Sequence, residues 1–127
     1  MTRFLIDADT AIYAMVDQNS PIVVRMSSMH PGDIMISTIS FAEIMLGSAN
    51  DRPPPPQVLE AFIAAIPLVP FDEAAARAYA NLPFKRARFD RLLAAHALSI
   101  GATVVTNNEA DFVDVPGLRV ENWTLPL

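Results

Sequence analysis

Short apolar runs alternate along this chain with longer stretches in which apolar residues recur at helical spacing. The short runs are typical of buried strands, and the longer stretches are typical of helices that pack against a sheet. The predicted strands are residues 4–6, 34–36, 68–69, 103–105 and 118–120. The predicted helices are residues 10–16, 21–29, 40–48, 57–66, 72–79 and 90–100. This alternation predicts one α/β domain over residues 1–127, with a central, mainly parallel sheet of four to five strands covered by helices on both faces.

The C-terminal third holds a helix, a tight turn and a buried strand in succession. The helix opens at Asp90 and is apolar nearly all round, and Gly101 occupies the position of a left-handed C-terminal cap. Residues 103–105 form the strand, and Asn108 and Asp111 follow it. Open parallel sheets place their ligand sites at this carboxyl edge, so a site is expected here.

Acidic residues from distant parts of the sequence are expected at the same edge. Asp7 ends the first strand, and Glu43 falls in the first turn of the helix after the second strand. Loops after parallel strands and the starts of the following helices share one edge, so these two acids can meet Asn108 and Asp111 there. Asp90 joins them only if the start of its helix also lies at that edge.

Each acid except Asp7 also has a purely structural explanation. Glu43 completes a capping box with Ser40, and Asp90 complements a helix dipole. Asp111 suits an ordinary exposed loop. Asp7 differs because it directly follows an apolar strand and precedes a second acid, which is costly without a cation to offset the repulsion.

Carboxylates with an amide oxygen, in a chain without cysteine, favour a hard cation such as Mg²⁺ or Mn²⁺. Such an ion can hold a phosphodiester oxygen and lower the pKa of a bound water. The two histidines are not expected to be catalytic, because His30 lies in a turn and His96 lies on a different helix face from Asp90.

Charge and composition set further limits. The net charge of −5 disfavours nucleic acid as a partner overall, yet Lys85, Arg86, Arg88 and Arg91 cluster beside Asp90. This cluster is either a solvated turn or a patch that steers phosphate. Arg91 is also placed to brace a neighbouring acid. The opening apolar run stops early, and no apolar run approaches the length of a membrane span, so a soluble, cytoplasmic protein without a membrane partner is expected.

Four segments, in the same order and spacing, resemble the PIN-domain ribonucleases, and most closely the VapC toxins of bacterial toxin–antitoxin pairs. The segments are FLIDADTAIYA, ISTISFAEIMLG, FDRLLAAHALSIGATVVTNNEADF and VPGLRVENW. The resemblance implies a compact, PIN-like three-layer α/β/α domain that cleaves RNA with Mg²⁺ or Mn²⁺ bound to its acids. It also implies a homodimer and inhibition by a cognate VapB-type antitoxin.

The chain departs from the usual family pattern at two places. Asp-Ala-Asp replaces Asp-Thr-Asn, so Asp9 adds a carboxylate that either joins the metal shell or turns away to cap the first helix, a role that Thr10 also suits. The fourth acidic position is Asn108, with Asp111 following, and either completes the metal shell.

The predicted site residues fall into three sets. The catalytic set is Asp7, Glu43, Asp90 and Asp111, the metal ligands are Asp7, Asp9, Asp90, Asn108 and Asp111, and the RNA-binding set is Lys85, Arg86, Arg88 and Arg91.

Two other functions compete with this prediction. Asp7-Ala8-Asp9-Thr10 matches the D-x-D-x-T nucleophile loop of haloacid-dehalogenase-like phosphatases, but Glu43 and Asp90 would then have no role. The second alternative is a catalytically weak PIN binding module, in which the acids only hold a metal or a partner.

Overall fold

Five short parallel strands form the centre of the fold. The computed structural model describes residues 3–83 and 88–125 of the chain. The strands are β1 (Phe4–Ile6), β2 (Ile34–Ser37), β3 (Leu68–Val69), β4 (Thr103–Val105) and β5 (Val120–Glu121). They pair in the order β3-β2-β1-β4-β5, and every pairing is parallel. The predicted α/β class with a parallel sheet is therefore confirmed.

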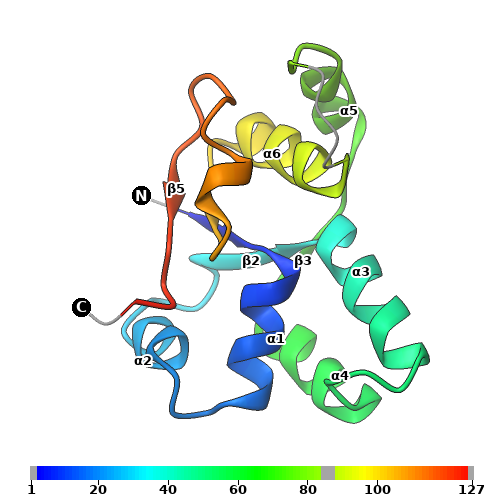
Figure 1. Cartoon of the computed structure of the whole chain (residues 1–127), viewed down its shortest axis with the longest axis vertical. Coiled ribbons are helices and arrows are strands. Elements are labelled where there is room, and N and C mark those ends of the chain that lie inside the picture. Colours follow the sequence, from blue (N-terminus) through cyan, green and yellow to red (C-terminus); the bar gives the residue numbers. More distant parts are fainter. Residues whose placement is uncertain (1–2, 84–87, 126–127) are drawn as a thin grey trace.

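Helices cover both faces of this sheet, as Figure 1 shows, with α5 and α6 above it and α1, α2 and α4 below. The helices are α1 (Ala8–Val16), α2 (Pro21–Ser27), α3 (Thr38–Ala49), α4 (Pro56–Ala65), α5 (Glu73–Ala80) and α6 (Arg88–Ile100), with a short 3₁₀ helix, η1 (Glu109–Asp111). Every residue of β1, β2 and β4 is buried, because a parallel sheet covered on both sides has no solvent face.

Alternate residues of the central strands enter two separate cores. Leu5 packs with Met35 and Val104 in the core under α6, whereas Ile6 and Ile36 belong to the core against α1, α2 and α4. The alternation follows from the two-residue period of a strand.

The chain adds strands first on one side of β1 and then on the other, while all strands keep the same direction. From β1 it moves outward through β2 and β3, and it then returns to the other side of β1 for β4 and β5. The carboxyl ends of β1 and β4 therefore form a topological switch point, the usual place for a ligand site in such sheets. The backbone N–H of Asp7 donates to Val105 O at 2.9 Å, which places Asp7 at this point.

The start of α3 differs from the predicted one. Strand β2 continues through Ser37, whose Oγ accepts a hydrogen bond from the Ile39 N–H at 3.0 Å and caps the helix. Ser40 consequently lies inside α3, and its buried Oγ has no hydrogen-bond partner among residues 3–83 and 88–125. The predicted capping box of Ser40 and Glu43 is thus wrong, and Glu43 lies in the second turn rather than the first.

Two further boundaries depart from the sequence prediction. Helix α1 begins at Ala8, capped by Asp7 rather than by Asp9 or Thr10. The last strand is Val120–Glu121 instead of residues 118–120, because its pairing with β4 places Val120 opposite Val104. Gly101 has the predicted left-handed conformation, with φ of +67°.

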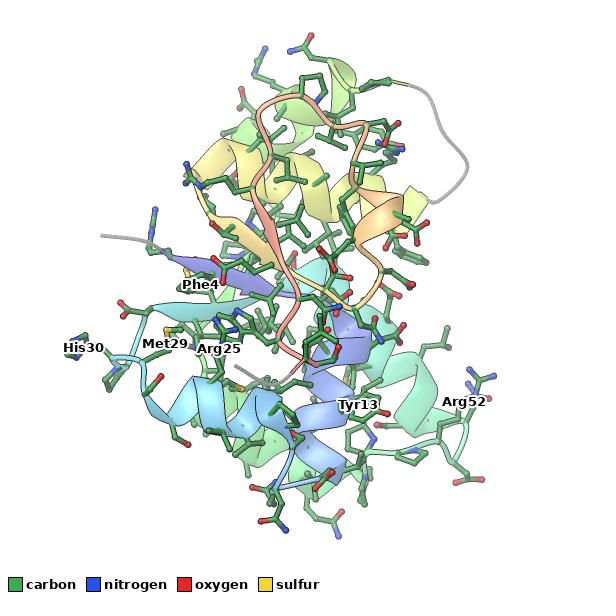
Figure 2. The ribbon with its side chains drawn as sticks, turned by 60° about the vertical axis from the view of Figure 1, so that its left-hand side comes forward. Phe4, Tyr13, Arg25, Met29, His30 and Arg52 are labelled. Carbon is green, nitrogen blue, oxygen red and sulfur yellow. The ribbon has the colours of Figure 1, made fainter. Side chains whose placement is uncertain are left out.

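The C-terminal segment is held against the first strand and α2. The fully buried Trp123 packs edge-on against Phe4 at 4.9 Å, and the Arg25 guanidinium lies 5.6 Å from the Trp123 ring centre. Phe4 and Arg25 are on the same side of the molecule in Figure 2. Within the described part of the chain, no helix is long and apolar enough to span a membrane.

Candidate active site

Asp7 is the most deeply buried of the candidate acids, with 7% of its surface exposed. Its Oδ1 accepts a hydrogen bond from the Thr10 N–H at 2.9 Å and so caps α1. Burial raises the pKa of Asp7 above its usual value, and the neighbouring charge of Asp9 raises it further. Hydrogen bonds from the Thr106 side chain and the Thr10 backbone act in the opposite direction. Asp7 thus orders the start of α1, and the Thr106 side chain at the end of β4 also holds its carboxylate.

Glu43 faces the same edge from α3. Its side chain is half-buried, and burial is the main reason that its pKa rises to about 7. The charges of Asp90, Asp9 and Asp7 contribute the rest, in that order. A carboxyl group with a pKa near neutrality can both accept and release a proton at physiological pH.

Asp90 lies in the first turn of α6, and Asp111 ends η1. Burial, followed by the charges of Asp111 and Asp7, raises the pKa of Asp90 to about 6. A hydrogen bond between the Asp90 and Asp111 side chains favours the protonated form of Asp90 and contributes to this rise. Helix α6 runs back to the amino end of β4, so its own start lies at the carboxyl edge, as the convergence of the acids requires.

Asn108 and Asp111 occupy different places relative to the acids. Asn108 immediately precedes η1, and its backbone N–H donates to Thr106 Oγ1 at 3.0 Å. The single turn of η1 then carries Asp111 back toward Asp90. The side chains of Asp111 and Asp90 are in contact, and which of Asn108 and Asp111 completes a metal shell stays a prediction.

Asp9 is exposed in the first turn of α1 and caps nothing, because Asp7 has that role. Its charge nevertheless raises the pKa of Asp7, Glu43 and Asp90. Asp7 has the capping role that was one of the two predicted for Asp9, and a place for Asp9 in a metal shell stays a prediction.

The acids influence one another, yet they are not arranged as a finished metal shell. Among residues 3–83 and 88–125, no three carboxylate or imidazole groups are close enough together to ligate one ion. The pKa shifts act over longer distances than metal–ligand bonds, so the two observations agree on a loose cluster of mutually repelling carboxylates. An all-oxygen donor set with this excess of negative charge fits Mg²⁺ or Mn²⁺.

The predicted RNA-binding residues have mixed outcomes. Lys85 and Arg86 lie outside the described residues, as does the side chain of Arg88. Arg91 is only 5% exposed, and its Nη2 donates to both carboxylate oxygens of Asp114 at 2.8 Å. Its guanidinium therefore faces the protein interior and braces an acid, which was the second role expected for it.

The supporting residues Thr106 and Ser37 were not predicted. Thr106 directly follows β4, and this position after a buried strand was the available indication of its contact with Asp7. Ser37 Oγ lies 2.8 Å from His96 Nδ1, which joins the start of α3 to the middle of α6. Burial lowers the pKa of His96, against an opposing effect of Asp72, so the imidazole is neutral and structural.

The fold and the acidic edge together define a known class of protein. The sequence profile of the PIN domain matches residues 4–118, and the chain belongs to the PIN-domain family. This confirms the resemblance drawn from the four sequence segments.

Within this family, the chain is similar to the VapC ribonucleases over its whole length. It is 31% identical to a tRNA(fMet)-specific endonuclease VapC of Shigella flexneri, with 98% of this chain and 100% of the relative covered. It is 30% identical to the protein of the same name from Salmonella typhimurium, over 97% and 99% of the two chains.

Solved structures agree with this placement. DNA-bound VapBC of Salmonella typhimurium superposes with a TM-score of 0.82 at 28% identity, covering 97% of this chain and 99% of that one. VapBC2 of Rickettsia felis, bound to a promoter DNA fragment, has a TM-score of 0.84 at 23% identity, over 96% and 99% of the chains, and supports the fold alone.

Proposed function

We propose that this chain is the endoribonuclease toxin of a toxin–antitoxin pair, and that it hydrolyses RNA phosphodiester bonds with the help of Mg²⁺ or Mn²⁺. The observation that carries the proposal is the convergence of Asp7, Glu43, Asp90 and Asp111 from four separate segments, with raised pKa values for the first three. Relatives of about 30% identity over the whole chain are named VapC endonucleases.

Each carboxylate has a separate role in this proposal, assigned from its surroundings. Asp7, Asp90 and Asp111 would hold the cation, with Asp9 and Asn108 beside them. When bound, the cation supplies charge neutralisation for the phosphate and activation of water. Glu43, whose pKa is near neutrality, would accept a proton from the attacking water at its carboxylate oxygen. Asp7 is held in one orientation by its hydrogen bond with the Thr10 amide.

The RNA would approach over the segment that precedes Asp90. Lys85, Arg86 and Arg88 give this part of an otherwise acidic sequence a positive charge, and such charge attracts a polyanion over a Debye length of about 8 Å at physiological salt. Arg91 is left out of this set because it is buried against Asp114. Transfer RNA is the substrate class to test first, since the two relatives above are named tRNA(fMet)-specific.

A VapB-type antitoxin is the proposed partner, because the structural neighbours are VapBC assemblies. An apolar groove of about 400 Å³ between α1, α2 and α4 offers it a docking surface away from the acids. Its lining includes Met15, Met26, Ala61 and Phe62. An amphipathic segment of the partner would bury its apolar side chains there.

Ala61→Arg tests this docking surface. The variant should bind the antitoxin at least tenfold more weakly and cleave RNA as wild type does. Equal binding by the variant would place the antitoxin elsewhere.

Homodimerisation in the cytoplasm completes the proposal. Leu46 on α3 is 67% exposed and Met45 is 45% exposed, so this helix has apolar surface for a second copy. Sedimentation of the isolated chain at micromolar concentration distinguishes a dimer from a monomer.

Cleavage of RNA by the purified protein tests the proposed activity. Wild type should cut tRNA with Mn²⁺ and fail to do so after chelation, and Asp90→Asn should be inactive in both conditions. Binding of RNA without cleavage by wild type would favour the binding-module alternative. Hydrolysis of a phosphate monoester would favour the phosphatase alternative, although the burial of Asp7 as a helix cap disfavours a nucleophilic role.

A further inference from the structure

A partly buried ion pair connects the two segments that carry Asp90 and Asp111. Arg91 follows Asp90 on α6, and Asp114 lies one turn beyond Asp111. The Arg91 Nη2 donates to both Asp114 oxygens at 2.8 Å. Figure 1 shows the η1 segment lying against α6. The ion pair therefore spans the same gap as the contact between the two candidate metal ligands.

Stability alone does not explain this pair. The Arg91 side chain is 6% exposed, and its Nε and Nη1 have no hydrogen-bond partner within residues 3–83 and 88–125. A buried guanidinium with unused donors is costly, and an apolar pair of similar volume often stabilises a protein as well or better. Two apolar anchors, Phe112 and Val115, already attach the segment to the core under α6.

The two apolar anchors do not fix the orientation of the segment. Packing of Phe112 and Val115 is favourable over a range of orientations, because the hydrophobic effect is non-directional. The Arg91 Nη2 contacts both oxygens of Asp114, and charge-assisted hydrogen bonds of this kind fix the position of a partner more narrowly than apolar packing does. Such a constraint is needed where Asp111 and Asp90 repel each other before a cation binds.

We propose that the Arg91–Asp114 ion pair holds Asp111 beside Asp90, so that both carboxylates reach one divalent cation. Arg91 and Asp114 are positioning residues, acting through the segment between Asp111 and Asp114. The inference rests on the proposed function, in which Asp90 and Asp111 are metal ligands.

Direct measurement of Mn²⁺ affinity in the full chain tests this role. Asp114→Asn should weaken Mn²⁺ binding by about 10- to 100-fold, as loss of a group that orients a ligand typically does. Cleavage by this variant should return close to the wild-type kcat once Mn²⁺ is saturating. Asp114→Glu keeps the charge and should retain most of the affinity. Glu73→Gln is the matched control, because the Glu73–Arg77 pair (2.7 Å) lies on the exposed face of α5.

Hydrogen exchange of the metal-free protein provides a second, independent measurement. Amides of residues 111–115 should exchange faster in Asp114→Asn, whereas those of β4 should be unchanged. Arg91→Lys, which keeps the charge but loses the two-oxygen contact, should give an intermediate result and serves if Asp114→Asn does not fold.

The outcomes separate this inference from the proposed function. Equal Mn²⁺ affinity in wild type and Asp114→Asn, with a lower melting temperature only, would make the pair merely structural and overturn the inference. Absence of Mn²⁺ binding and of RNA cleavage in wild type would overturn the proposed function and the inference with it. RNA cleavage that is intact in every variant without any change in metal dependence would overturn the inference alone.

Discussion

Replacing Glu43 with glutamine should stabilise the metal-free protein at alkaline pH. The pKa of Glu43 is about 7 instead of the usual 4.5, because its carboxylate is half-buried and faces Asp90, Asp9 and Asp7. At about 1.4 kcal/mol for each pH unit, this difference corresponds to roughly 3.5 kcal/mol of lost stability when Glu43 is ionised. Solvent reaches the half-exposed group and screens it, so we expect about 1–2 kcal/mol.

The direction of the pH dependence follows from the raised pKa. Between about pH 4.5 and 7 the folded protein binds more protons at Glu43 than the unfolded chain does, so the free energy of unfolding falls as the pH rises through this range. Above the folded-state pKa the full penalty is present. Glu43→Gln removes the titrating group, and its advantage over wild type should be largest at pH 8 and vanish near pH 4.5.

Urea denaturation with a chelator, at pH 5 and at pH 8, measures this difference. Glu60→Gln is the control, because Glu60 is exposed on α4, away from the acidic edge. A Glu43→Gln protein that is less stable than wild type at pH 8, or that differs by the same amount at both pH values, would refute the electrostatic argument. Addition of Mn²⁺ should narrow the difference at pH 8, since a cation bound to the folded state offsets the repulsion that ionised Glu43 adds to the neighbouring carboxylates.

Four further variants test the site. Asp7→Asn and Asp90→Asn should each abolish RNA cleavage while the circular dichroism spectrum stays native. The fold is expected to persist because asparagine at position 7 still caps α1, and because either change relieves carboxylate repulsion. Residual cleavage above one per cent would remove that residue from the catalytic set. Asp9→Asn restores the usual family residue and should keep activity, and its complete loss would show a site rebuilt around Asp9. The double variant Lys85→Ala, Arg86→Ala should weaken the binding of different RNA sequences by similar factors. It should also reduce the slope of log affinity against log salt concentration by about 1 to 2. An unchanged affinity and slope in a filter-binding titration would place the RNA path elsewhere.

The order and type of the helices and strands were available from the sequence. The two-residue and helical periods of apolar residues mark strands and helices locally, so the positions of β3, β4 and the left-handed Gly101 agree with the structure. Parallel connections then bring Asp7 and Glu43 to one edge, because the chain must re-enter every strand from the same end.

Only the tertiary structure decided which polar groups make contact. The sequence indicated Ser40 as the cap of α3, and because β2 extends one residue further than predicted, Ser37 caps the helix instead. The sequence left Asn108 and Asp111 as alternative ligands, and the contact between Asp111 and Asp90 appears only in the folded chain. Arg91 belonged to a basic cluster in the sequence and lies inside the fold against Asp114. The pattern of apolar residues in one segment determines whether it forms a helix or a strand and which face is buried. The contacts between side chains distant in sequence depend on strand register and helix packing, and no single segment determines these.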